Sequence, residues 1–304
     1  MSNNRLIAVV GPTASGKTGL AVEIAKRIGG EIVSCDSMQI YRDIPIASAV
    51  ATEEEKAGIP HYLTEFLDPD SSFSVAEYVA AARKCIDDIL SRGKTPILCG
   101  GTGLYYSSLV DNVSFEDQPG QTEIRDRLLR ELEETSAENM HEKLKAVDPD
   151  LAEKLAVSDT RRVIRALELF ELTGLNAQKR NELSKSNPSP YDLLAIGIDY
   201  KDRQILYSRI ERRIDIMVQN GLVAEAEARF KKSGGASQAI GHKEFFPFFN
   251  GEITLEKAVE DLKTSTRRYA KRQLTWFRRD ERINWIFADE TEDVVSAAME
   301  IINK

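Results

Sequence analysis

The residues most able to do chemistry form the run Gly11-Pro12-Thr13-Ala14-Ser15-Gly16-Lys17-Thr18. This run fits the pattern G-x-x-x-x-G-K-[ST], in which glycines let backbone N–H groups approach phosphate oxygens. Lys17 would place a positive charge at a terminal phosphate, and the hydroxyl of Thr18 would hold Mg²⁺. An apolar run precedes these residues and a helical pattern follows, so the positive end of a helix would face the phosphate. The sequence therefore predicts a phosphate-binding loop, and a turn that binds nothing is the weaker interpretation.

Asp36 is the second candidate, and it follows an apolar run that we expect to be a strand. Ligands of α/β proteins bind outside the carboxyl ends of parallel strands, where this carboxylate would lie. There Asp36 could hold Mg²⁺ through water or act as a general base. On local sequence alone, a side-chain cap of the next turn is an equally good interpretation.

A phosphate loop usually indicates a nucleoside triphosphatase or a kinase, but the rest of the chain does not fit that class. The strand expected at 95–99 would end in an acidic residue in such an enzyme. Here it runs into Gly100-Gly101-Thr102-Gly103 instead, and the guanine signature Asn-Lys-x-Asp is missing from the sequence. The phosphates could therefore belong to something other than a nucleoside triphosphate.

An α/β core is needed to position these residues. Short apolar runs at 6–10, 31–34 and 95–99 predict buried strands, and helical patterns at 17–28 and 75–90 alternate with them. Strands that alternate with helices indicate parallel β-α-β units. We therefore predict an α/β fold with a P-loop-type parallel sheet core that carries helices on both faces.

The character of the chain changes near residue 115. The segment 115–190 is highly charged, helical in pattern and without strand signals, and it ends in the break Asn187-Pro188-Ser189-Pro190. A buried strand is then expected at 193–198, followed by mostly helical sequence and a short strand near 284–287. We predict a core formed by 1–114 and 191–304, interrupted by an inserted all-helical domain at 115–190.

Charge is distributed unevenly along the chain. The formal net charge is −8, yet 116–159 alone holds 13 acids and six bases, whereas 263–282 holds eight bases and two acids. A basic segment in an acidic protein can still bind an anionic partner.

No apolar run approaches the ~20 residues of a membrane span, no signal peptide is evident, and three widely spaced cysteines indicate neither a disulfide framework nor a zinc site. We expect a cytoplasmic protein with no membrane partner.

The combined motifs resemble the tRNA dimethylallyltransferases, also called tRNA isopentenyltransferases, and the bacterial type fits best. The resemblance spans nearly the whole chain, with matches at 11–18, 36–41, 59–61, 100–105, 160–168, 238–241 and 267–277. Segments 36–41 and 267–277 together are far more specific than the phosphate loop. The resemblance implies transfer of a dimethylallyl group from dimethylallyl diphosphate to the N6 amine of the adenosine 3′ of the anticodon. Diphosphate would leave, and Mg²⁺ would assist.

The resemblance also assigns roles in catalysis. Asp36 would be the general base, Lys17 would stabilise the leaving group, and Thr102 would contact and orient the target adenosine. Arg213 would add a phosphate contact, although a surface charge paired along its helix explains it equally well. The diphosphate would be bound by Gly11, Pro12, Thr13, Ala14, Ser15, Gly16, Lys17, Thr18 and Arg213, and the metal by Thr18 and Asp36.

A larger set of residues would hold the tRNA anticodon stem-loop. The family's RNA-contacting segments correspond to Asp36, Ser37, Met38, Gln39, Thr102, Arg125, Arg161, Arg162, Val163, Ile164, Arg165, Gln238, Ala239, Ile240, Gly241, His242 and Lys243. For the arginines at 161–165 a solvated helix face is the alternative. In the basic run 267–279 the side chains Tyr269, Gln273, Trp276 and Phe277 share a helical face. We expect the three aromatic side chains to pack in the core, with the bases of the run available for phosphate contact.

Some positions depart from the family pattern. Val50 stands where the family has a lysine, His242 where tyrosine is usual, and Tyr62 where a second histidine is common.

The competing hypotheses are an adenylate isopentenyltransferase that acts on free nucleotides, a small-molecule kinase and a nucleotide-gated RNA-binding module. A helical insertion with an arginine cluster favours the tRNA enzyme, because a free nucleotide needs no such arm. We expect a monomer.

Overall fold

The computed structural model describes residues 4–115, 121–184, 188–232 and 234–304 of the chain. The chain forms two compact units, one made of Met1–Val110 with Ser189–Lys304 and the other of Asp111–Pro188. The sequence placed these two divisions after residues 114 and 190. None of the helices in the described part of the chain has the length and apolar character that crossing a lipid bilayer requires.

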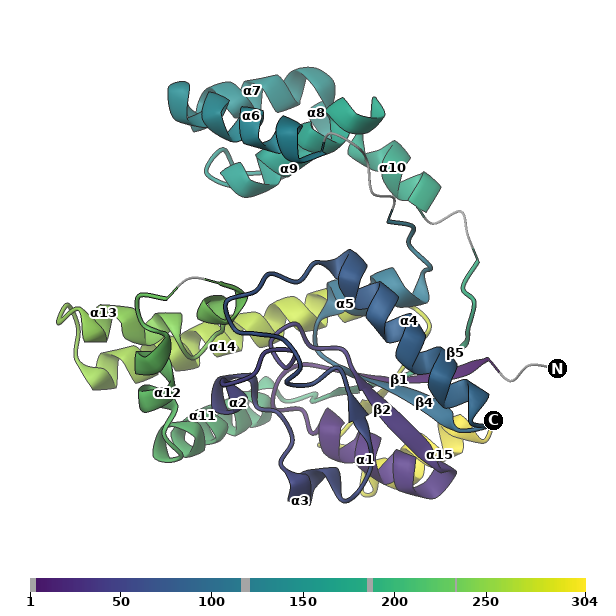
Figure 1. The fold of residues 1–304 in the computed structure, drawn as a ribbon. Helices are drawn as coiled ribbons and strands as arrows, with labels where there is room; N and C mark the ends of the chain where they lie inside the picture. The colour runs from purple at the N-terminus through teal and green to yellow at the C-terminus, as the bar shows by residue number, and fades with distance from the viewer. Residues whose placement is uncertain (1–3, 116–120, 185–187, 233) are drawn as a thin grey trace. The chain divides into compact units, whose positions relative to one another are not determined.

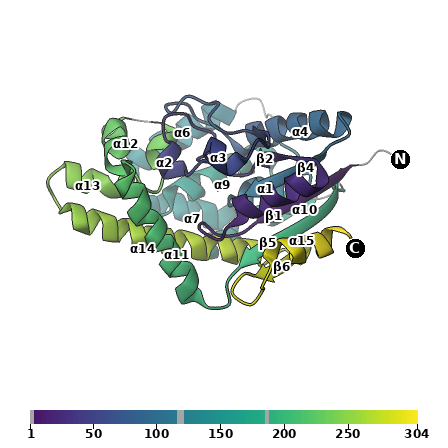
Figure 2. The same ribbon diagram turned by 90° about the horizontal axis from the view of Figure 1, so that it is seen from below.

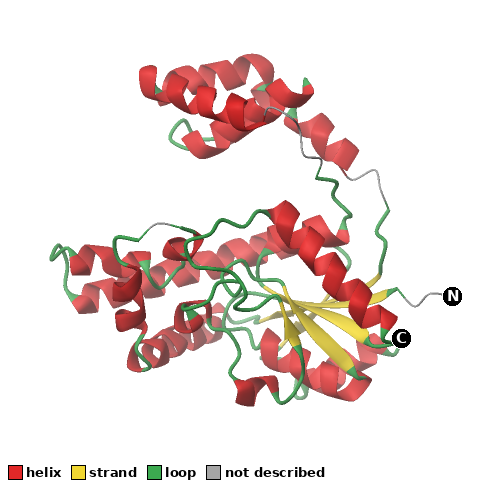
Figure 3. Cartoon of the chain, viewed as in Figure 1, coloured by secondary structure: helices red, strands yellow, loops and turns green. Residues whose placement is uncertain are grey.

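The first unit is built on a six-stranded parallel sheet with the order β3-β2-β4-β1-β5-β6. Figure 3 shows the strands in yellow and the helices in red. The parallel sheet confirms the predicted fold class. The edge strand β3 was not predicted, because two residues are too few to show a strand period. The strands are β1 (Arg5–Val10), β2 (Gly30–Ser34), β3 (His61–Tyr62), β4 (Thr95–Gly100), β5 (Asp192–Asp199) and β6 (Ile283–Phe287).

Helices cover both faces of the sheet, as predicted. Because side chains alternate along a strand, Leu6 and Val10 of β1 pack into one core while Ile7 and Val9 pack into the other. The first core contains side chains of α4 (Val75–Ser91) and α5 (Gly103–Val110). The second contains side chains of α1 (Lys17–Ile28) and α15 (Val294–Ile302). Figures 1 and 2 show α4 on one side of the sheet and α1 with α15 on the other.

A third core lies between α11 (Arg203–Gln219), α12 (Leu222–Arg229) and α14 (Leu255–Phe277). Its buried residues recur at helical spacing along α11, as at Leu206, Ile210 and Ile214. The shorter elements of the unit are α2 (Pro45–Ser48), α3 (Glu53–Lys56), α13 (Phe246–Phe249) and the 3₁₀ turns η1 (Gly235–Gln238) and η2 (Lys243–Phe245).

Every regular element among the described residues of the second unit is a helix. These helices are α6 (Gln121–Glu134), α7 (Ala137–Val147), α8 (Pro149–Lys154), α9 (Thr160–Thr173) and α10 (Ala177–Ser184). Helix α9 begins after Asp159, which caps the N–H of Arg162, and ends at Gly174 in the left-handed conformation. Leu128, Leu144 and Leu167 belong to a core of this unit's own. An independent core explains why the insertion does not interrupt the sheet.

Candidate active site

The glycine-rich loop connects the carboxyl end of β1 to the first turn of α1. Ala14 has φ +61° and Gly16 has φ +96°, so residues of positive and negative φ alternate along this part of the loop. At Gly11 a Cβ atom would come 2.6 Å from the carbonyl oxygen of Ile198, which leaves room for glycine alone. Loops with this alternation turn backbone N–H groups toward a common point and suit an anion at a helix N-terminus.

A cavity of about 290 Å³ adjoins this loop at the carboxyl edge of the sheet. The predicted residues Lys17, Thr18 and Asp36 line it, and Arg213 of α11 reaches it from a distant part of the sequence. Ile210 of α11 is among the apolar side chains of the wall. The cavity therefore combines a polar, charged part with an apolar part, as an amphiphilic ligand requires.

Two cations of the cavity form no ion pair or hydrogen bond with a carboxylate among the described residues. The Nζ atom of Lys17 donates to the carbonyl oxygen of Pro12 at 3.2 Å, and Arg213 makes no hydrogen bond or ion pair with any of the described residues. Burial lowers the pKa of Lys17, and burial also lowers the pKa of Arg213. A buried charge without a partner is costly, so an anion in the cavity would stabilise both side chains. Arg213 thus lies in the cavity and is not a surface charge.

Asp36 makes the turn-capping bond that one interpretation of the sequence expected. Its Oδ1 atom accepts from the N–H of Met38 at 2.9 Å, while no hydrogen bond to Oδ2 is found among the described residues. Thr102 is held nearby, because its N–H donates to the backbone carbonyl oxygen of Cys35 and its hydroxyl oxygen accepts from the N–H of Ser37 at 3.0 Å. The structure thereby brings the candidate base and the candidate adenosine contact together.

Gln273 is a site residue that the sequence placed on the helical face of the aromatics without a role of its own. Its Oε1 atom accepts from the N–H of Thr13 at 2.9 Å, and its Nε2 atom donates to the carbonyl oxygen of Gly101 at 2.9 Å. Helix α14 is thus tied to the glycine-rich loop and to the loop after β4. A glutamine on the apolar face of an amphipathic helix is the signal that could have indicated this role.

The other residues predicted to share that helical face have different environments. Phe277 is fully buried and packs edge-on against Tyr106 at 5.7 Å between ring centroids, as expected. Tyr269 lines the cavity, and burial raises its pKa. The prediction for Trp276 was wrong, because 41% of this residue is exposed. Its ring lies against the backbone of Gly103, where a Cβ atom would come 2.3 Å from Cδ1.

Several residues predicted to contact tRNA lie at the cavity. Ser37, Met38, Gln39, Ile240 and Lys243 line it. The side chain of Gln238 lies outside the described residues, and Gly241 is buried at φ +110°.

Ala239 and His242 require correction, because both are fully buried. Ala239 packs in the small core around Ile40 and Tyr41. The Nε2 atom of His242 lies 2.9 Å from Oε1 of Glu225, whose carboxylate also accepts from the backbone of α2. Their side chains support the cavity wall and present no surface for RNA.

The remaining candidates lie in the second unit. Arg161 and Arg162 are exposed on α9, and Arg162 lies 3.4 Å from Asp159. Arg125 and Arg165 both pair with the fully buried Glu168, the former at 3.7 Å.

Val163 and Ile164 are buried in the core of that unit, so the prediction of RNA contact for these two side chains is corrected to packing. They are apolar residues on the inner face of the helix that carries the arginines.

The parallel sheet, the glycine-rich loop and the cationic cavity are the features of α/β enzymes whose sites bind phosphate groups. The chain belongs to the IPP transferase family, whose model matches residues 39–280. It is 46% identical to the tRNA dimethylallyltransferase of Caldanaerobacter subterraneus subsp. tengcongensis, over 94% of this chain and 92% of that protein. It is 48% identical to the enzyme of the same name from Acetivibrio thermocellus, over 94% of this chain and 93% of that protein. These relatives confirm the resemblance seen in the sequence.

Solved structures show the same fold. The full-length tRNA isopentenylpyrophosphate transferase of Bacillus halodurans is 41% identical, with a TM-score of 0.73 over 99% of this chain and 95% of that one. A eukaryotic dimethylallyltransferase described as acting on tRNA is 28% identical, with a TM-score of 0.78 over 98% of this chain and 78% of that one.

Proposed function

We propose that this protein transfers a dimethylallyl group from dimethylallyl diphosphate to the N6 amine of the adenosine 3′-adjacent to the anticodon of tRNA, with release of diphosphate. Family membership and relatives named tRNA dimethylallyltransferase support the reaction class. The observation that carries the proposal is the cavity itself, where Lys17 and Arg213 face the same space as Asp36. Neither cation has an ion-pair partner in the part of the chain that the structure describes.

The diphosphate lies against the glycine-rich loop. As the bond between C1 and oxygen breaks, negative charge develops on the diphosphate and allylic cation character develops on carbon. Backbone N–H groups, Lys17 and Arg213 stabilise that charge because they are already oriented before the reaction. The dimethylallyl group lies against the apolar side chains of the wall, such as Ile210.

Mg²⁺ fits the oxygen donors of this cavity. Thr18 supplies a hydroxyl and Asp36 a carboxylate, and Mg²⁺ usually takes one or two protein ligands beside substrate phosphates and water. When bound, the ion adds to the stabilisation of charge on the diphosphate. These two oxygen donors suit a hard cation.

Asp36 acts as the general base. The N6 amine of adenine is a poor nucleophile because its lone pair is delocalised into the ring, so its proton must leave as the C–N bond forms. The Oδ2 atom accepts that proton, while the bond from Met38 to Oδ1 holds the carboxylate in orientation. General base catalysis of this kind contributes typically ~10²–10⁴-fold. Thr102 orients the adenosine beside it.

The target base must be extruded from its stack to reach the cavity. Extrusion from a single-stranded loop costs less than extrusion from a duplex, and such loops are recognised by stacking and base-edge contacts. Ser37, Met38 and Gln39 contact the nucleotide at the cavity, and the exposed Arg161 and Arg162 contact tRNA phosphates through the second unit.

The test is a transfer assay with labelled dimethylallyl diphosphate, Mg²⁺ and unmodified tRNA that carries adenosine 3′ of the anticodon. Parallel arms contain AMP in place of tRNA, and ATP alone. We expect label in tRNA, a loss of ~10²-fold or more in Asp36→Ala, and a normal rate in Asp87→Asn, an exposed acid on α4. Label in AMP alone would indicate the free-nucleotide enzyme, and ATP turnover without transfer would indicate a kinase.

A further inference from the structure

Two carbonyl groups of the glycine-rich loop are held from outside the cavity. The Nε atom of Arg209, on α11, donates to the carbonyl oxygen of Ala14 at 2.9 Å. The hydroxyl of Tyr200, directly after β5, donates to the carbonyl oxygen of Ser15 at 3.3 Å. The two donors also contact each other, because the guanidinium of Arg209 lies 5.4 Å from the centroid of the Tyr200 ring. Among the described residues that line the cavity, Ala14 is present while Tyr200 and Arg209 are not.

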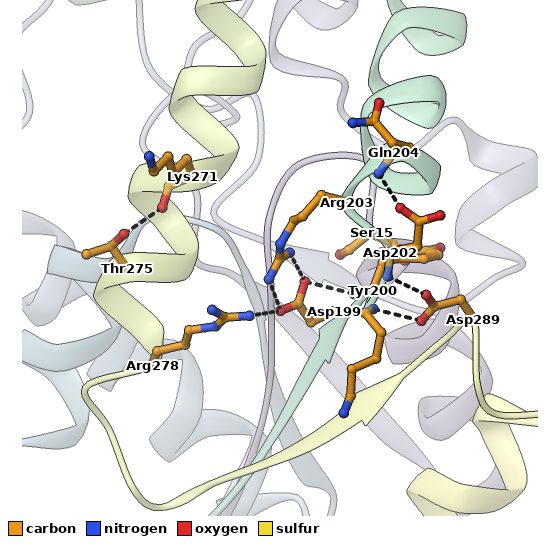
Figure 4. A network of polar contacts seen from close by, with 11 residues as sticks. Ser15, Asp199, Tyr200, Asp202, Arg203, Gln204, Lys271, Thr275, Arg278 and Asp289 are labelled. Atoms are coloured by element: carbon orange, nitrogen blue, oxygen red, sulfur yellow. Dashed lines mark hydrogen bonds and ion pairs between the residues drawn. The ribbon is translucent and has the colours of Figure 1, made fainter.

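An ion cluster around a buried carboxylate anchors Tyr200 (Figure 4). Asp199 is fully buried and accepts from the backbone N–H of Tyr200 at 2.8 Å. Its carboxylate also accepts two bonds from Arg203, at 2.6 and 3.0 Å, and one from Arg278 at 2.8 Å. Asp289 fixes the next part of the chain by accepting from the backbone N–H groups of residues 201 and 202. Tyr200 therefore projects from a segment that is held on two sides.

The loop requires such support because its backbone is unfavourable by itself. Ala14 adopts the left-handed conformation, which disfavours any residue with a Cβ atom. Conformations of this kind persist only where the surrounding structure holds them. The bonds from Arg209 and Tyr200 fall on Ala14 and on the residue that follows it.

Holding a carbonyl group also directs the N–H group of the same peptide unit. The described chain contains no cis peptide bond, so the C=O and N–H of one unit point in opposite directions. When Tyr200 holds the oxygen of Ser15, the N–H of Gly16 is turned the other way, and no hydrogen bond from it is found among the described residues. When Arg209 holds the oxygen of Ala14, the N–H of Ser15 is turned likewise, and this group makes only a 3.3 Å turn bond to Pro12.

We propose that Tyr200 and Arg209 are positioning residues that orient the N–H groups of the loop toward the diphosphate before it binds. The proposal rests on the proposed function of the cavity. Neither side chain touches the substrate. Their contribution is preorganisation, which lowers the cost of ordering the loop at the moment of binding and keeps its dipoles aimed at the charge that develops in the reaction.

The test measures the affinity of inorganic pyrophosphate in the presence of Mg²⁺ by titration calorimetry. We expect Tyr200→Phe and Arg209→Gln each to weaken binding by roughly 3- to 10-fold, as the net loss of one hydrogen bond implies. The matched control is Arg212→Gln, which removes an exposed charge from the same helix and should bind as the wild type does. Because Tyr200→Phe changes no charge, its effect separates positioning from simple attraction of an anion.

A second measurement distinguishes a local change in the loop from a change in the stability of the whole protein. Hydrogen exchange of the peptide that spans 11–18 should be faster in free Tyr200→Phe than in the free wild type, and pyrophosphate should restore much of the protection. A merely structural role would lower the melting temperature without this local change. If Tyr200→Phe fails to fold, Arg209→Gln carries the test alone, because Arg209 is exposed on its helix.

The outcomes distinguish this proposal from the function on which it rests. A wild type that does not bind pyrophosphate would overturn both. In the other case the wild type binds pyrophosphate, Tyr200→Phe and Arg209→Gln bind it equally well, and hydrogen exchange of the loop is equally slow in all three proteins. That result would overturn the positioning role and leave the proposed function intact.

Discussion

The Oε1 atom of Gln273 lies 2.9 Å from the backbone nitrogen of Thr13 and accepts a hydrogen bond from its N–H group. Some 260 residues of chain separate the two partners. Through this contact the long helix α14 fixes one side of the loop that we assign to the diphosphate. The same amide group donates to Gly101 and so fixes the loop after β4 as well.

The first prediction concerns this bridge. Gln273→Leu should lower the free energy of unfolding by about 1–3 kcal/mol, because the buried C=O of Gly101 and the partly buried N–H of Thr13 lose their partners. It should also raise the KM for dimethylallyl diphosphate. Urea denaturation and initial-rate kinetics measure both effects. Thr275→Ala, on the exposed side of α14, should stay within about 0.5 kcal/mol of the wild type, and an equal loss in that variant would contradict the bridge.

The second prediction concerns the two cations of the cavity. Lys17→Met and Arg213→Gln should each lower kcat by roughly 10²–10³-fold, the usual effect of removing a group that stabilises developing charge. Single-turnover kinetics at saturating donor measure the chemical step. Arg212→Gln, one residue away on α11 but exposed, is the matched control. Arg213→Gln with a normal rate would show that the guanidinium in the cavity has no part in the reaction.

The third prediction compares two glycines near the loop. In Gly11→Ala the new methyl group would come 2.6 Å from a backbone oxygen at Ile198, so the loop must shift. We expect pyrophosphate binding to be lost, as measured by calorimetry. Gly19→Ala, in the exposed part of α1 with nothing within 4 Å, should bind normally and should stabilise the protein by roughly 0.5–1 kcal/mol. Normal binding by Gly11→Ala would contradict the close approach of the loop to β5.

The fourth prediction concerns stability and pH. Glu31 is buried at the start of β2, and hydrogen bonds from Arg92 hold its pKa down to about 2. A lowered folded-state pKa stabilises the protein above the unfolded value of 4.5, and this stability is lost as the pH falls toward 2. Urea denaturation should show Glu31→Gln to be less stable than the wild type by roughly 1–3 kcal/mol at pH 6. This difference in the free energy of unfolding should become smaller at pH 3. A larger difference at pH 3 would contradict a lowered pKa of Glu31 in the folded protein.

The elements that position the cavity could be predicted because their signals are local. The apolar run of β1, the spacing of the glycines before Lys17 and the helical pattern of α1 are continuous in the sequence. They therefore predicted both the loop and its place beside the sheet. Arg213 and Asp36 carried equal alternatives, because local sequence does not show which surface a side chain will face.

The side-chain environments that the sequence did not predict correctly share one physical cause. A helical wheel gives the angle of a side chain but not its distance from the core, so Trp276 and Phe277 were grouped although one is exposed and the other buried. The burial of His242 depends on Glu225, and the role of Gln273 depends on Thr13, neither of which adjoins its partner in sequence. Polar contacts between residues far apart in the sequence produce no periodic pattern, so a sequence pattern cannot predict them.

The most direct test of the account is to locate the transferred group and to measure how its transfer depends on Asp36. Wild type and Asp36→Asn would be given tRNA and dimethylallyl diphosphate in single-turnover conditions, and the digested tRNA would be analysed by mass spectrometry. We expect dimethylallyl on N6 of the adenosine 3′ of the anticodon, formed at least ~10²-fold more slowly by Asp36→Asn, whose Oδ1 can still accept from Met38. Transfer to another nucleoside, or an Asp36→Asn rate equal to that of the wild type, would contradict the account.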